Sequence, residues 1–298
     1  MIESLVREPL RWMEDRPHHR SGIRMLQLFT GICVLYRLAT EARFAFFLWG
    51  PNGIATGSAT LLFGAWVGSA LDIFFRSNSG VVLFLLAITL AAIGYVAGFC
   101  TRLATLTLAV GFTVLTVRSP FLVDSGDSLI SIVLCYLILV LPRKRESKPG
   151  RWQTWLHNVG VVAITMQTVI VYATAGLWKT SGRFWMEGTA LYYVGQVAEF
   201  SEPSLRWLFA NAILVNALTW GTILFQLWFP IAIFSRFRIP WLICAMCMHV
   251  GIAVFMGLVS FSLVMIGVDL FLITDPEYEV IAAALSRASA GVRHLSRA

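Results

Sequence analysis

The sequence predicts an all-α polytopic membrane protein. We expect about eight transmembrane helices, both termini in the cytoplasm, and one further segment that is interfacial or re-entrant on the outer side. Hydrophobic residues fill 58% of the 298 positions and charged residues only 13%, and the mean hydropathy is +0.75. Soluble domains carry about a quarter charged residues, so this composition excludes that class of protein.

Eight apolar runs approach the roughly 20 residues that a helix needs to cross about 30 Å of hydrocarbon. They cover about residues 24–48, 81–99, 102–119, 124–142, 154–178, 209–235, 240–257 and 259–274. The stretch 54–75 is also apolar, but glycines and small polar residues interrupt it. We therefore expect it to be the outer interfacial or re-entrant segment. No cleavage site follows the first run, which is expected to stay as an anchor.

The distribution of lysine and arginine predicts the orientation. With the N-terminus in the cytoplasm, sixteen of the 23 basic residues fall on the cytoplasmic side and six on the outer side, with Arg37 inside a span. This is a positive-inside pattern, to which the connection PRKRESKPGR at 142–151 contributes most. It explains the net charge of +7 by topology and by attraction to an anionic inner leaflet. We expect the cell inner (plasma) membrane as the location, and no nucleic-acid partner.

The chain is expected to form a single membrane domain over residues 1–298. Its core covers about 20–275, between a basic cytoplasmic tail at 1–23 and a cytoplasmic C-terminal tail at 276–298. No internal repeat, low-complexity linker or second soluble domain is visible in the sequence.

Several strongly polar residues lie within the apolar runs, where each needs a partner or a purpose. Arg37 and Glu41 are one helical turn apart, which favours an ion pair or, alternatively, an anion site. Asp124 and Asp127 open an outer helix end, where one caps the helix and Asp127 either accepts a proton or pairs with a base. Gln226 forms an interhelical hydrogen bond or contacts a ligand.

The run at 154–178 leads into Lys179. Thr165, Thr168, Tyr172 and Lys179 fall within roughly a 60° arc of one helix face. Ala175 and Gly176 fill the gap in that stripe, as a close helix contact or as room for a ligand beside the amine. Aromatic residues follow the lysine, among them Trp185.

His249 lies near the middle of CAMCMHVGIAVFMG. The spacing is not that of a haem-attachment motif, and no further histidine or cysteine lies close by in the sequence, so no metal site is expected. The histidine either forms a hydrogen bond inside the bundle or takes a catalytic or ligand-binding role.

Five segments, in this order, carry a resemblance to a known family: GFCTRLAT (98–105), RSPFLVDSGDSLISIVLCYLILVLP (118–142), YATAGLWKTSGRFWMEGTALYY (172–193), GTILFQLWFPIAIF (221–234) and MHVGIAVFMGLVSFSLVMIGVDL (248–270). Over roughly residues 20–275 the chain resembles the HTTM family. This is the membrane domain shared by vitamin K-dependent gamma-carboxylase and its bacterial relatives, including the sporulation-delaying-protein-B-like group.

The resemblance implies that Lys179 is the base that deprotonates a reduced quinone, with Trp185 matching a downstream tryptophan of the carboxylase. His249 corresponds to a family histidine, and Asp127 falls in an outer segment where the carboxylase has functionally important polar residues. Two departures stand out. Gln226 occupies a position that is commonly acidic, and the large lumenal portion that binds protein substrate has no counterpart here. Carboxylation of protein glutamates is therefore not carried over.

Three hypotheses follow. The first is a quinol-linked or peptide-modifying enzyme, of lyase or oxidoreductase type, acting at the outer half of the bilayer. Its catalytic residues would be Lys179, His249 and Asp127, and its ligand-binding residues Tyr172, Trp185, Arg37 and Gln226. The second is a non-catalytic accessory protein for maturation, export or immunity of a secreted peptide, with that peptide or another protein as partner. A transporter or channel ranks last, because no internal repeat is present.

Overall fold

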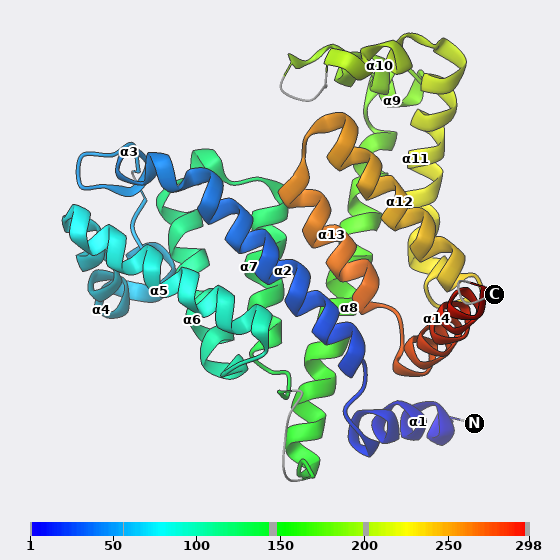
Figure 1. Ribbon diagram of the computed structural model, residues 1–298, viewed down its shortest axis with the longest axis horizontal. Helices are drawn as coiled ribbons and strands as arrows, with labels where there is room; N and C mark the ends of the chain where they lie inside the picture. Colours follow the sequence, from blue (N-terminus) through cyan, green and yellow to red (C-terminus); the bar gives the residue numbers. More distant parts are fainter. Residues whose placement is uncertain (1, 56, 143–147, 199–202, 296–298) are drawn as a thin grey trace.

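Each predicted apolar run forms a helix, and these helices follow one another along the chain. In the computed structural model, residues 2–55, 57–142, 148–198 and 203–295 are described, and they form helices and turns with no strand. Figure 1 shows the long helices packed side by side. One helix falls on each predicted run, in the order α2 (Arg20–Glu41), α5 (Asn78–Ala97), α6 (Thr101–Arg118), α7 (Ser125–Leu137), α8 (Arg151–Thr180), α11 (Ala212–Ala232), α12 (Arg238–Met256) and α13 (Val259–Phe271).

Five stretches among the described residues are long and apolar enough to cross a membrane, or six if a bent pair counts as one span. The five are Arg20–Trp49, in which α2 continues into α3 (Ala45–Trp49), together with α5, α8, α11 and α12. The bent pair is α13 with α14 (Asp275–Leu295), at 101°. Since α7 and α13 have 13 residues each, they cover only about 20 Å of a hydrocarbon core of about 30 Å. The protein is a multi-pass membrane protein, and the number eight stays a prediction.

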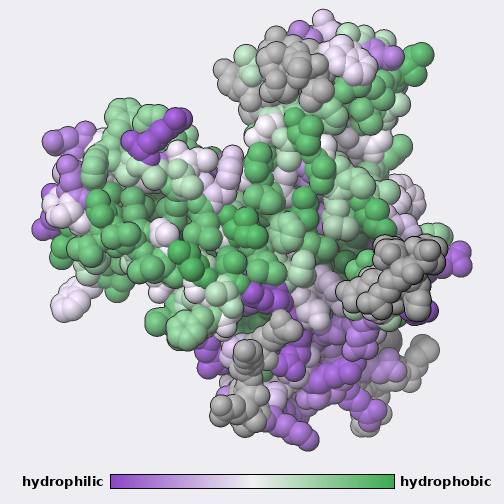
Figure 2. Space-filling view, viewed as in Figure 1, coloured by the Kyte–Doolittle hydropathy of each residue, from purple (hydrophilic) through white to green (hydrophobic). Residues whose placement is uncertain are grey.

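The two ends of the bundle differ in polarity. α1 (Ile2–Asp15), the start of α8 and α14 lie at one end, and α9 (Arg183–Met186) and α10 (Ala190–Gln196) lie at the other. Figure 2 shows hydrophobic residues over the middle of the visible face, and hydrophilic residues gathered where α1 and the start of α8 lie. Residues 143–147, which hold three basic residues of the predicted cytoplasmic connection, lie outside the described residues. Which end faces the cytoplasm stays a prediction.

In the described residues of the segment 54–75, which leave out residue 56, no helix is long enough to cross the bilayer. Its main helix, α4 (Thr60–Asp72), is interrupted at Gly64, where φ is 73°, and a short 3-10 turn, η2 (Ile73–Arg76), follows. Asp72 accepts a hydrogen bond from Ser58 and pairs with Arg118 at 2.9 Å, which fastens the segment to the end of α6. Trp66 is 94% exposed.

Two pairs of helices in the bundle pack closely at a glycine. α2 packs against α13, and a Cβ added at Gly267 would lie 2.7 Å from the Cβ of Phe29. α8 packs against α11, and a Cβ at Gly176 would lie 3.0 Å from the side chain of Leu227. Glycine at these positions therefore brings the helix backbones close to each other, as is typical of membrane bundles.

Candidate functional site

Tyr172, His249 and Asp269 form a hydrogen-bonded cluster at the centre of the bundle, one each from α8, α12 and α13. The Tyr172 hydroxyl lies 2.9 Å from Nε2 of His249 and 3.0 Å from both carboxylate oxygens of Asp269. The three residues are 1%, 2% and 0% exposed. Ionisable groups at such depth in a membrane protein are costly, and they mark functional sites by default.

The hydrogen-bond pattern assigns a direction to the cluster. A tyrosine hydroxyl has one proton, and Tyr172 donates it to Asp269. Nε2 of His249 must then carry a hydrogen and donate to the Tyr172 oxygen, which leaves Nδ1 as the bare nitrogen. Nδ1 is buried and has no hydrogen-bond partner among the described residues. The cluster thus contains an unused proton acceptor at one end and a carboxylate at the other.

Aromatic side chains enclose this cluster. The ring of Phe229 stacks on Tyr172 at a centroid distance of 3.7 Å, and Phe225 meets the same ring edge-on at 6.1 Å. Phe261 meets the ring of His249 at 5.7 Å. Such walls exclude water, and they strengthen the electrostatic interactions among the polar groups inside.

The sequence stripe on α8 faces the bundle only in part. Thr168, Tyr172 and Gly176 are buried, whereas Thr165 and Lys179 are half-buried. Leu227 occupies the space beside Gly176. Of the two interpretations of the small residues in the stripe, the structure therefore favours helix packing at Gly176.

Lys179 lies apart from the cluster. It follows Tyr172 by seven positions, which correspond to roughly 10 Å along a helix. Its Nζ lies 4.8 Å from the ring centroid of Trp185 and donates to the carbonyl of Ala175 at 3.3 Å. Within the described part of the chain, no carboxylate forms a salt bridge with it.

Arg37 and Asp127 form a second buried group. The Arg37 guanidinium pairs with Asp127, donates to Glu41 at 2.8 Å, and donates to the carbonyl of Leu122 at 2.9 Å. Asp127 and Asp124 also form a reciprocal cap at the start of α7, each carboxylate accepting the other's backbone N–H. The ion pair and the cap both use Oδ2 of Asp127, and its buried Oδ1 has no hydrogen-bond partner among the described residues.

The start of α13 separates the two groups. Phe261 contacts His249, and a Cβ at Gly126 would lie 2.9 Å from the Cα of Phe261. The three residues predicted to be catalytic therefore fall in three places, with His249 in the cluster, Asp127 beside Arg37, and Lys179 beside Trp185. Gln226 is buried, and its carbonyl oxygen has no partner among the described residues.

Asp269 is the residue of the cluster that the sequence analysis did not single out. The sequence does contain a feature that could have identified it. Asp269 is the one charged residue in the apolar run 259–274, and a charge in such a run needs an explanation. In the part of the chain that the structure describes, no group of three or more histidine, cysteine or acidic side chains is arranged to hold a metal ion.

The chain is similar to two Bacillus subtilis proteins. It is 27% identical over 176 residues to the protein YitO, an alignment that covers 53% of this chain and 57% of YitO. It is also 27% identical over 165 residues to the sporulation-delaying protein SdpB, covering 50% of each chain. The chain thus spans about half the length of the curated relatives it matches. No family model matches it, and no solved structure gives a significant match.

Proposed function

We propose that this protein is an integral-membrane enzyme that moves a proton to or from a lipid-soluble substrate, of the quinol-linked or peptide-modifying kind that the HTTM resemblance implies. The observation that carries the proposal is the Tyr172–His249–Asp269 cluster, which joins three buried titratable side chains by hydrogen bonds. A hydrogen-bonded chain of this kind can hold a proton and pass it along at little charging cost.

Lys179 is the proposed base. In its neutral form the amine takes the proton of a substrate hydroxyl, and the electron pair of that bond stays on the substrate oxygen. Trp185 lies over the amine at 4.8 Å and stabilises the ammonium that forms, through the negative face of its ring. The Tyr172–His249–Asp269 cluster, whose tyrosine lies on the same helix as Lys179, is the proposed store for the proton. Nδ1 of His249 is the nitrogen that would accept it.

Two substitutions of the lysine test this role. Lys179→Ala removes the amine, and Lys179→Arg keeps the positive charge but cannot act as a base near neutral pH. Vitamin K hydroquinone added to the purified protein in detergent is the probe, with binding followed by tryptophan fluorescence and deprotonation by the absorbance of its anion. We expect both variants to lose deprotonation, whereas Lys148→Ala, the substitution of an exposed lysine, retains it.

A second pair of variants tests the cluster. Tyr172→Phe interrupts the hydrogen-bond chain while keeping the ring stacked on Phe229, and we expect it to slow proton release without abolishing binding of the hydroquinone. If Lys179→Ala and Tyr172→Phe both fold and deprotonate the hydroquinone at the wild-type rate, the enzymatic proposal is wrong.

The similarity to SdpB favours a second candidate function. Here the protein would be an accessory factor for maturation, export or immunity of a secreted peptide, with no chemistry of its own. Deletion of the gene in its host would then abolish secretion of, or resistance to, that peptide. Complementation with Lys179→Ala, Tyr172→Phe and His249→Gln separates the two functions, because an accessory factor that folds would restore the phenotype in all three cases.

A further inference from the structure

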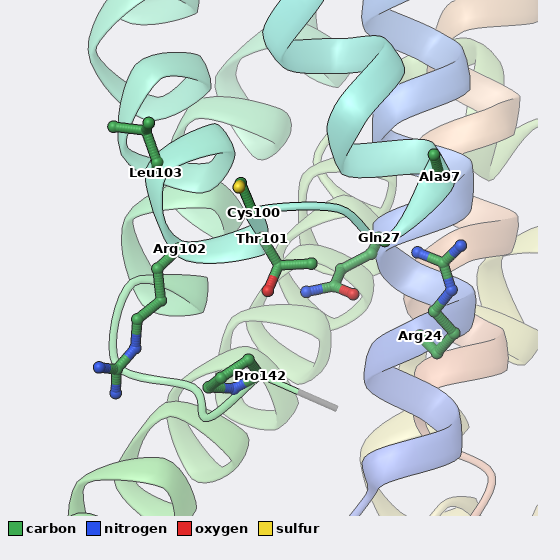
Figure 3. A pocket seen from close by; sticks show the side chains of 9 residues that line it. Arg24, Gln27, Ala97, Cys100, Thr101, Arg102, Leu103 and Pro142 are labelled. Carbon is green, nitrogen blue, oxygen red and sulfur yellow. The ribbon is translucent and has the colours of Figure 1, made fainter. Parts of the chain in front are cut away.

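A hollow with both polar and apolar walls lies at the end of the bundle where α5 joins α6. It has a volume of about 680 Å³ and continues into a smaller hollow of about 220 Å³. The two share Gln27, Thr101, Arg102 and Pro142 in their walls. Figure 3 shows side chains of α2 on one side of the larger hollow and the start of α6 on the other. Ligand pockets in proteins have volumes in this range.

Hydrogen-bond donors line the hollow, and none of the described residues in its wall is acidic. The Arg24 guanidinium donates to the carbonyls of Tyr95 and Val96 at the end of α5, which fixes its position while further N–H groups stay available. Arg102 is exposed and has no ion-pair partner among the described residues. α6 begins at this hollow, and no side chain caps its first turn, so its backbone N–H groups favour an anion there.

The side-chain amide of Gln27, unpartnered within the described chain, points to a ligand in the hollow. Its side chain is only 7% exposed and lines both hollows, yet none of the hydrogen bonds in the described part of the chain involves its amide. In Figure 3 the amide lies between Arg24 and Thr101. No protein group among the described residues occupies this amide, so its donor and acceptor atoms are available to a ligand in the hollow.

The smaller hollow is more apolar. Leu106, Leu137 and Ile138 line it, and Leu103 lines the larger one. Leu103 is 67% exposed, and Leu106 and Ile138 are also exposed at the surface of the bundle. An anionic group in the larger hollow would therefore have a path for a hydrocarbon chain beside it.

We propose that this hollow binds the phosphate headgroup of an anionic phospholipid. Arg24, Arg102 and the start of α6 bind the phosphate, Gln27 bonds to its oxygens or to the headgroup, and an acyl chain lies along Leu103 and Leu106. Basic pockets between membrane helices bind anionic lipids in this manner on the cytoplasmic side, which is where the charge pattern places Arg24 and Arg102. The proposal does not depend on the chemistry proposed for Lys179.

Binding of short-chain lipids to the detergent-purified protein tests the site. Native mass spectrometry would measure the affinity for dihexanoyl phosphatidylglycerol, for dihexanoyl phosphatidylcholine as the zwitterionic comparison, and for inorganic phosphate as the free anion. The variants are Arg102→Ala, Gln27→Leu and, as a matched control, Arg236→Ala. Arg236 is also an exposed arginine, and it lies outside both hollows.

We expect the wild-type protein to bind phosphatidylglycerol more tightly than phosphatidylcholine or inorganic phosphate. Arg102→Ala should weaken that binding about fivefold, and Gln27→Leu about tenfold, the effect of one hydrogen bond to a charged group. Arg236→Ala should leave it unchanged. Arg102 is exposed, so its variant should fold even if Gln27→Leu does not.

Three results would each overturn the proposal. Equal affinity for the two lipids would show that the phosphate charge is not recognised. Equal affinity for inorganic phosphate would make the hollow a site for the free ion. An equal loss in Arg102→Ala and Arg236→Ala would show general attraction between basic side chains and an anionic lipid, without a defined site.

Discussion

Arg37 and Asp127 neutralise each other inside the bundle, so the effect of replacing either depends on the other. Asp127→Asn keeps the shape of the side chain but leaves the Arg37 guanidinium with Glu41 as its one carboxylate partner among the described residues. We expect a loss of about 3 kcal/mol in the free energy of unfolding, in the range found when one member of a buried pair is removed. Denaturant unfolding of the protein in detergent would measure it.

A triple variant is the control for this interpretation. Arg37→Met combined with Asp127→Asn and Glu41→Gln removes all three charges of the group, and its loss should be smaller than that of Asp127→Asn alone. A loss as large as that of Asp127→Asn alone would mean that the pairing of these charges is not what Asp127 contributes to stability.

Asp72 makes one connection of the segment 54–75 dependent on pH. Burial would raise the pKa of its carboxyl, but the hydrogen bonds from Ser58 and the Ala59 N–H and the pairing with Arg118 outweigh that effect and hold the pKa below its ordinary value. A lowered pKa in the folded state stabilises the connection at pH values above the ordinary pKa of about 4. That contribution is lost as the pH falls through the lower, folded-state pKa.

Hydrogen exchange of residues 57–72 between pH 2 and 7 would detect this change. We expect protection in the wild-type protein to fall at the acidic end of the range. Asp72→Asn should have weaker protection that changes little with pH. The same acid-dependent loss in Asp72→Asn would assign the effect to another group.

At the scale of the elements, the packing of α2 against α13 depends on glycine. Gly267→Ala would place a Cβ 2.7 Å from the Cβ of Phe29, so one of the two helices must shift. We expect a loss of about 1–3 kcal/mol, as is usual for overpacked cores. Gly221→Ala is the matched control, since it lies inside α11 with nothing within 4 Å of the added atom, and it should stabilise α11 by up to about 1 kcal/mol.

Thermal unfolding of the two variants in the same detergent would measure this difference. The expected order of midpoints is Gly221→Ala at or above wild type, with Gly267→Ala well below it. Equal midpoints would mean that the α2–α13 contact relaxes around the methyl group without cost.

The apolar runs of the sequence predicted where helices lie, but not all of their ends. The run 124–142 forms a helix only as far as Leu137, and its last residues form turns. The Leu141 N–H donates to Nδ1 of His157 on α8, at 3.0 Å. Hydropathy does not change at that point, so only the contact with a later helix shows where α7 ends.

At the scale of the whole molecule, the α1 and α14 ends of the chain lie together. Asp275, at the start of α14, accepts backbone hydrogen bonds from Arg20 and Ser21 at the start of α2. The charge pattern predicts that this basic end is cytoplasmic. Alkaline phosphatase fused after the last residue should then be inactive, and green fluorescent protein fused at the same place should be fluorescent. The same reporters inserted after Val197, at the opposite end, should give the reverse pattern.

An active phosphatase at the C-terminus would reverse the assigned orientation. Equal activity at both positions would contradict the placement of α14 and α10 at opposite ends of the bundle.

The sequence predicted the individual polar residues better than their grouping. Tyr172 and His249 were identified because polar side chains in apolar runs need a reason, and the structure joins them. Lys179, which the family resemblance made the central residue, lies beside Trp185 and outside that cluster. Periodicity reports which residues share a face of one helix, whereas grouping depends on the pairing of helices that are distant in the sequence, such as α8 with α13.

The burial of Asp269 also bears on how the protein enters the membrane during synthesis. A helix of 13 residues with a carboxylate partitions poorly into lipid by itself, and Tyr172, which bonds that carboxylate, belongs to a helix made earlier. α13 therefore enters the bilayer against helices that are already in place. Its main packing partner is α2, which is synthesised long before it. Until α13 arrives, the side of α2 that α13 covers in the finished bundle lacks its helix partner.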